Sequence, residues 1–133
     1  MNEHPNIERA RQYLRAVENG AVGPELAAFF SPDVEHVELP NRLNPAGVKL
    51  DLPGVLQAAE RGQRVVSEQR YAVRSAMADG DRVALEIEWS AKLKVALGTI
   101  PQGGTMRASF AVFITYRDGR IVAQRNYDCF EPF

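Results

Sequence analysis

The sequence has few of the residue types that bind metals or form disulfides. Among its 133 residues there are one cysteine and two histidines. Because Cys129 is alone, an intrachain disulfide is excluded, and a reducing, cytoplasmic setting is expected. His4 and His36 are far apart in the chain, and no spacing of acidic, histidine or cysteine residues resembles a metal-ligand set. We therefore expect no metal and no cofactor.

The chain also lacks an excess of charge and a long apolar run. Its 16 basic and 17 acidic side chains give a formal net charge of −1. Nucleic-acid binding is therefore disfavoured, because no basic surplus is available to contact phosphates. No apolar run approaches the ~20 residues of a membrane-spanning helix, so no membrane partner is expected. With 45% apolar residues, the sequence predicts a single globular domain over residues 1–133.

Three helices are predicted in the first half of the chain. Apolar side chains recur at spacings of 3, 4 and 7 in residues 5–19, and Gly20 ends that helix. Pro24 suits the first turn of a short second helix that ends near Phe30. Asp51 is a typical N-cap for a third helix, which has Pro53 in its first turn.

The remaining pattern predicts strands. Residues 34–39, 71–77 and 82–94 alternate between apolar and polar side chains, and residues 106–130 form two long runs. These two runs fold back on Asp118 and Gly119, a pair typical of a tight hairpin. Helices together with a mainly antiparallel sheet indicate an α+β fold in which the helices lie on one face of the sheet.

The last strand carries polar residues on a face expected to be buried. Gln124, Asn126 and Asp128 share this face because side chains alternate along a strand. Polar groups among apolar strands indicate a lined pocket, and the surrounding apolar residues favour a small apolar molecule as its ligand.

The order of elements and four segments resemble the nuclear transport factor 2-like superfamily, in its SnoaL-like and ketosteroid isomerase-like branch. The segments are Tyr13–Gly20, Phe30–Asp33, Asp118–Ile121 and Asn126–Phe130. The resemblance implies a cone-shaped, curved antiparallel sheet with three helices on its concave face. It also implies a cofactor-free isomerase or cyclase that acts by proton transfer on a carbonyl or polyketide-like compound.

The resemblance assigns roles to individual residues. It implies that Tyr13 donates a hydrogen bond to a substrate oxyanion and that Glu38 is the proton-shuttling base. The position of a second, acidic donor is occupied by Ala111, which can donate nothing, so half of that oxyanion site would be missing.

Other candidates follow from the residues themselves. His36 shares a strand face with Glu38, and the two form a candidate acid/base pair. Asp128 is expected to pair with His36 or Arg107, or to orient a water. The predicted catalytic set is therefore Glu38, Tyr13, His36 and Asp128, and the predicted ligand-binding set is Phe30, Trp89, Phe113 and Asn126.

Each candidate also has a purely structural interpretation. Tyr13 lies on the apolar stripe of its helix and can be a core aromatic residue. The polar side chains can form a structural network near the end of the last strand, and Cys129 is expected to be inert. The alternative to an enzyme is a non-catalytic ligand-binding or accessory domain of the same fold.

The long run of residues 109–116 is apolar on both faces. We expect Ala111, Phe113 and Thr115 to face the helices. The outward set would then be Phe110, Val112, Ile114 and Tyr116, together with Arg125, Tyr127 and Cys129 on the next strand. Such an exposed apolar patch predicts a homodimer through the outer face of the sheet.

Overall fold

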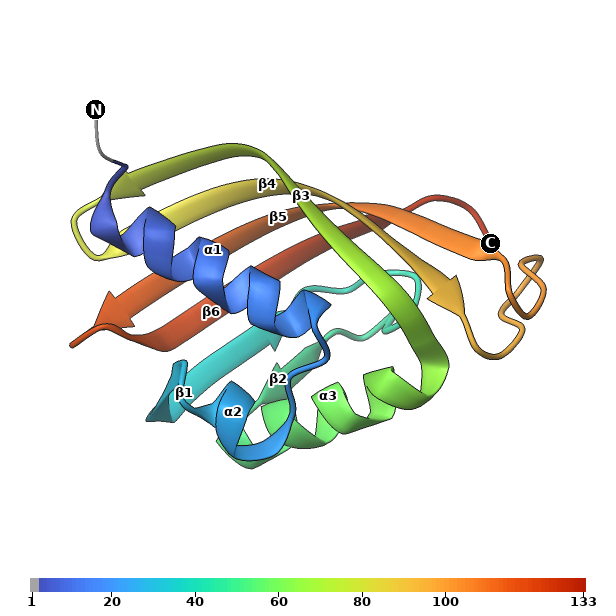
Figure 1. Cartoon of the computed structure of the whole chain (residues 1–133), viewed down its shortest axis with the longest axis horizontal. Helices are drawn as coiled ribbons and strands as arrows, with labels where there is room; N and C mark the ends of the chain where they lie inside the picture. The colour runs from blue at the N-terminus through green and yellow to red at the C-terminus, as the bar shows by residue number, and fades with distance from the viewer. Residues whose placement is uncertain (1–2) are drawn as a thin grey trace.

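The computed structural model describes residues 3–133, which form three helices and six strands (Figure 1). The helices and strands, in chain order, are α1 (Pro5–Glu18), α2 (Gly23–Ala27), β1 (Phe30–Glu38), β2 (Val48–Leu50), α3 (Leu52–Val65), β3 (Val66–Asp79), β4 (Arg82–Leu93), β5 (Thr105–Arg117) and β6 (Arg120–Phe130).

All six strands belong to one curved, open sheet in the order β2-β1-β6-β5-β4-β3. Strands β1 and β6 are parallel, and the other neighbours are antiparallel. The helices lie on the concave face of this sheet, with α1 crossing the long strands and α3 lying below the lower end of β3 (Figure 1). The α+β fold predicted from the sequence is therefore confirmed.

Local sequence signals account for the ends of the two long helices. The Nδ1 atom of His4 accepts a hydrogen bond from the backbone N–H of Asn6 at 3.1 Å, which caps α1. The Oδ1 atom of Asp51 accepts from the N–H of Gly54 at 3.0 Å and caps α3. Such caps satisfy backbone donors that have no partner within the helix.

The β5–β6 hairpin has the expected tight turn. Asp118 and Gly119 have φ angles of 53° and 77°, the positive values that a type I′ turn requires at both central positions. The turn fixes the register, so that Val112 pairs with Asn126 and Phe110 with Asp128. The polar face of β6 therefore lies beside the inward face of β5.

Three strands differ from the prediction. β1 begins at Phe30, β2 was not predicted, and β3 begins at Val66. The first part of β3 lacks simple alternation because its register shifts between Ser67 and Arg70, where Glu68 has a φ angle of 51°. A bulge of this kind bends a strand and interrupts its period of two.

The predicted orientation of β5 was wrong. Val112, Ile114 and Tyr116 are buried against the helices, whereas Phe113 is 43% exposed. The run is apolar on both faces, so its own alternation could not decide which side chains point inward. Pairing with β4 decides it: Val112 lies opposite Leu85, and side chains of directly paired residues share a face.

The outward positions of β6 were predicted correctly, since Arg125, Tyr127 and Cys129 are exposed. On the outer face Phe113 packs edge-on against Tyr127, with ring centroids 5.7 Å apart.

The buried side chains form two apolar clusters. The larger one lies between the helices and the sheet and includes Tyr13, Phe30 and Ile114. The smaller one surrounds Trp89 and Met106 near the β4–β5 connection. Within residues 3–133, no helix has both the length and the apolar character needed to cross a bilayer.

Candidate functional site

A cavity of about 240 Å³ lies between the helices and the concave face of the sheet. Apolar side chains of α1 and α3 form much of its wall, including Val17, Val55 and Ala59. Tyr13, His36, Asn126, Gln63 and Gln69 add polar groups to this apolar lining. A smaller hollow of about 60 Å³ shares Tyr13 and Asn126 with the cavity and reaches Gln124.

Tyr13 reaches the cavity from the buried stripe of α1. Its ring packs edge-on against Phe30 at 5.5 Å and tilted against Phe29 at 5.8 Å. Burial raises the pKa of the Tyr13 hydroxyl to about 12, although the neighbouring Gln124 amide partly offsets this. At neutral pH the hydroxyl is therefore a hydrogen-bond donor, held in place by two aromatic rings.

The parallel strands β1 and β6 form the polar wall of the cavity. Their register places His36 beside Gln124 and Glu38 beside Asn126. The Gln124 Nε2 donates to Asn126 Oδ1 at 3.0 Å. By contrast, the buried His36 Nδ1 and Gln124 Oε1 atoms have no hydrogen-bond partner within the described protein. Such atoms are costly to bury alone, and a bound polar group would satisfy them.

Two side chains on these two strands, His36 and Asp128, have shifted pKa values. Burial lowers the pKa of His36, while the nearby Glu38 charge opposes the shift. Burial, together with repulsion from Glu38, raises the pKa of Asp128 to about 7. The Oδ1 atom of Asp128 is also buried and has no hydrogen-bond partner among residues 3–133. A neutral imidazole and a carboxyl group that titrates near neutral pH are the groups that proton transfer requires.

Glu38 is held by the loop that follows β1. Its Oε2 atom accepts hydrogen bonds from the side-chain amides of Asn41, at 3.0 Å, and Asn44. These two contacts could not be predicted from the sequence, because the target of an amide side chain cannot be inferred from a run of turn-forming residues. Glu38 and Asp128 do not line the cavity itself.

The predicted ligand-binding residues separate into different places. Asn126 lines the cavity, and Phe30 is buried behind Tyr13. Trp89 belongs to the second apolar cluster, where it stacks on Phe110 at 5.4 Å. The prediction that Phe113 lines the cavity was wrong, because its side chain lies on the outer face of the sheet, for the reason described above.

Two further cavity residues, Gln69 and Tyr71, were missed. The Gln69 Oε1 atom accepts from Trp89 Nε1 at 3.1 Å and from the Tyr71 hydroxyl at 3.2 Å. Both residues lie on β3 and line the cavity. The irregular start of β3 concealed them, since no period of two connects Gln69 to the rest of the strand.

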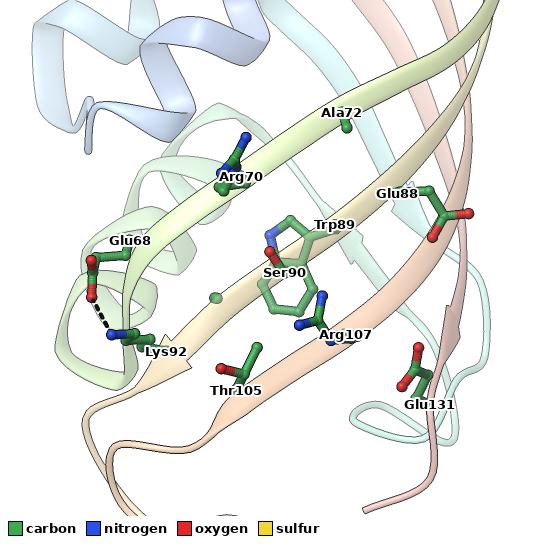
Figure 2. Close-up of a pocket in the computed structure, with 11 residues that line it drawn as sticks. Glu68, Arg70, Ala72, Glu88, Trp89, Ser90, Lys92, Thr105, Arg107 and Glu131 are labelled. Atoms are coloured by element: carbon green, nitrogen blue, oxygen red, sulfur yellow. Dashed lines mark ion pairs between the residues drawn. The ribbon is translucent and has the colours of Figure 1, made fainter.

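A larger hollow lies on the opposite face of the sheet. This outer depression, of about 460 Å³, is lined by charged and polar side chains of β3, β4 and β5 (Figure 2). Its lining includes none of the residues that were predicted to be catalytic. Among residues 3–133, no group of three or more His, Cys, Asp or Glu side chains is arranged to hold a metal ion.

The fold is shared with several solved structures of low sequence identity. IdmH from Streptomyces antibioticus, for which a polyketide cyclase role is suggested, is 19% identical with a TM-score of 0.79, over 94% of this chain and 92% of that one. A SnoaL-like polyketide cyclase from Agrobacterium tumefaciens is 17% identical with a TM-score of 0.72, over 95% and 92%. A protein with a ketosteroid isomerase-like fold from Catenulispora acidiphila, in complex with trimethylamine, is 16% identical with a TM-score of 0.70, over 94% and 86%.

Sequence comparison gives the family directly. No curated protein matches the chain. However, the model of the SnoaL-like domain matches residues 10–124, which include most of α1, the whole of α2 and α3, the first five strands and the beginning of β6. The chain therefore belongs to the SnoaL-like domain family and has the nuclear transport factor 2-like fold.

Proposed function

We propose that the cavity binds a small, largely apolar carbonyl compound and moves a proton on it without a cofactor, as an isomerase or cyclase does. The main support for this proposal is that Tyr13 and His36 line the same apolar cavity. The Nδ1 atom of His36 has no hydrogen-bond partner among the described residues. Polyketide cyclases among the structural relatives support the same class of chemistry.

In this proposal His36 takes a proton from a carbon next to the carbonyl group. Burial lowers the pKa of His36, so its imidazole is neutral and basic at pH 7. Electron density then moves to the carbonyl oxygen, which accepts a hydrogen bond from the Tyr13 hydroxyl. A donor already placed where negative charge develops stabilises the transition state.

Glu38 and Asp128 take supporting roles in this arrangement. The charge of Glu38 favours the protonated form of His36, and Asp128 is an acid that can supply or accept a proton near neutral pH. The sequence-based prediction that Glu38 itself is the base stays a prediction, since its carboxylate is bound by two amides outside the cavity lining.

The size of the cavity limits the ligand. A buried apolar cavity of ~150 Å³ can hold benzene, so the cavity of about 240 Å³ suits one or two rings. A four-ring compound would require movement of α3, whose Ala58 and Ala59 side chains form one wall.

Hydrogen exchange on a bicyclic ketone tests this function. The protein is incubated with 2-tetralone in deuterated buffer, and loss of the protons next to the carbonyl is followed by NMR. We expect exchange above the buffer rate, and His36→Gln and Tyr13→Phe should each lower it by ~10²-fold. His4→Gln is the matched histidine control, because His4 lies outside the cavity. Exchange that is equal in the parent and in His36→Gln would contradict the proposal.

The alternative is a domain that binds the same compounds without turnover. The two amides that hold Glu38 outside the cavity lining favour it. Ala111 pairs with the exposed residues Glu86 and Tyr127 on the outer face of the sheet, so its lack of a donor does not bear on the cavity. Trp89 reports binding because it is the only tryptophan and donates a hydrogen bond to the cavity residue Gln69. A fluorescence change with 2-tetralone that is not accompanied by proton exchange would establish this alternative.

A further inference from the structure

The outer depression contains a row of three polar residues on adjacent strands. Arg70 of β3 pairs with Ser90 of β4, and Ser90 pairs with Arg107 of β5. Adjacent strands are ~4.8 Å apart, so the backbones of the two arginines are ~10 Å apart, with Ser90 between them. Figure 2 shows Ser90 in this middle position, between Arg70 and Arg107.

These three side chains point away from the helices. Their neighbours Tyr71, Trp89 and Ala108 belong to the inner apolar clusters, and side chains alternate along each strand. Both arginines are exposed, and Ser90 is half-buried. The row is thus open to solvent and separate from the cavity on the concave face.

The other charges of the depression are already engaged. Lys92 pairs with Glu68 at 3.4 Å (Figure 2). Glu88 accepts from the Ser109 hydroxyl at 3.2 Å and lies 4.0 Å from Arg74. Within residues 3–133, neither Arg70 nor Arg107 forms a salt bridge.

One acidic side chain, Glu131, remains at the edge of the depression beside Arg107. The lining itself has three acidic and three basic side chains, and Arg74, which lies next to Glu88 outside the lining, brings the basic side chains to one more than the acidic ones. A guanidinium group prefers an oxyanion because its fork of N–H groups matches two oxygen atoms.

We propose that the outer depression is a binding site for a phosphate-type oxyanion, held by Arg70 and Arg107 with a hydrogen bond from the Ser90 hydroxyl. The three donors are spread over three adjacent strands, and a tetrahedral group presents oxygen atoms in more directions than a planar carboxylate does. The bulge at Glu68 contributes to the site, because it bends β3 where Glu68 and Arg70 line the depression.

Titration with inorganic phosphate tests the site. Backbone amide shifts are followed by NMR at constant ionic strength, with acetate as the carboxylate probe. We expect saturable shifts centred on Arg70, Ser90 and Arg107, and weaker binding of acetate. Arg70→Gln and Arg107→Gln should each weaken phosphate binding by ~10-fold, the scale of one charge-assisted hydrogen bond.

Arg82→Gln is the matched control, because Arg82 is an exposed arginine at the start of β4 and does not line the depression. It should change the affinity by less than ~2-fold, the effect of a distant screened charge. Equal weakening by Arg82→Gln, or the absence of saturable shifts, would overturn the proposal. So would a light-scattering result in which Arg70→Gln and Arg107→Gln dissociate a dimer, since the depression would then be an interface between copies.

Discussion

The two hollows of this protein both draw on strand β3, but they lie on opposite faces of the sheet and differ in volume and in the polarity of their linings. The concave cavity is about 240 Å³ and is largely apolar, with a few polar groups. The outer depression is about 460 Å³ and is lined mainly by charged side chains. Neighbouring residues serve opposite hollows: Arg70 points outward, whereas Tyr71 lines the cavity. The comparison shows that strand alternation, rather than position in the chain, decides whether a side chain lines the apolar cavity or the charged depression.

The largest effect on stability is expected for a substitution that places a charge on the inner face of the sheet. Val112→Asp places a carboxylate at a position that is 4% exposed, and should lower the free energy of unfolding by at least ~4 kcal/mol. The adjacent Phe113→Asp, at 43% exposure, should leave the fold intact. Circular dichroism with urea unfolding measures both variants. Similar losses in the two variants would contradict the observed orientation of β5.

Filling the concave cavity should affect binding more than stability. Ala59→Leu adds three carbon atoms to a wall of the cavity, and should weaken 2-tetralone binding by at least ~10-fold, since one or two methylenes already change pocket affinity by that amount. Trp89 fluorescence measures the affinity. Gln57→Leu, on the exposed side of α3, is the control and should bind as the parent does. Unchanged binding by Ala59→Leu would place the ligand elsewhere.

The buried acid of the inner face should make stability depend on pH. Asp128 has a folded-state pKa of about 7, raised from 3.8, so the folded protein retains a proton that the unfolded chain has lost. The contribution of Asp128 to stability is therefore most favourable at low pH and becomes less favourable as pH rises from about 4 to about 7.

Asp128→Asn removes this titration, so its melting temperature should exceed that of the parent by ~3 °C more at pH 8 than at pH 5, about 1 kcal/mol in a domain of this size. Glu88→Gln, at an exposed site of the outer face, should lack this pH dependence. Identical pH profiles for the parent and Asp128→Asn would show that Asp128 is not buried as described.

The smallest effect on the folded protomer is expected at the apolar part of the outer face. We propose that Phe113 and Tyr127 form the centre of a two-fold homodimer contact, since their rings pack together while remaining 43% and 38% exposed. Phe113→Asp should convert a dimer into a monomer on a sizing column with light scattering. It should change the unfolding free energy of the monomer by less than ~0.5 kcal/mol, as for most exposed sites.

This contact is separate from the oxyanion site, because Phe113 and Arg107 are six residues apart on β5, or ~20 Å along the strand. A parent protein that stays monomeric at high concentration would contradict the dimer. Arg82→Gln again serves as the control and should leave the oligomeric state unchanged.

Local sequence signals determined most of the architecture. Apolar periodicity and Gly20 located α1, whereas the Asp51 cap located α3 and the Asp118-Gly119 turn located the β5–β6 hairpin. A cap or a type I′ turn depends on only a few neighbouring residues. Alternation along β6 placed Gln124, Asn126 and Asp128 on the inner face, where the structure has them. The inner face of β6 could therefore be predicted before the fold was known, although only Asn126 of these three residues lines the cavity itself.

Only the tertiary structure decided the rest. Strand β5 is apolar on both faces, so its orientation depends on pairing with β4, and Phe113 lies outside for that reason. Asn41 and Asn44 reach Glu38 through the path of a loop, and Arg70, Ser90 and Arg107 meet only because three strands pair in one register. A sequence pattern records which way neighbouring side chains point, whereas contacts between distant segments depend on strand register, which no single segment specifies.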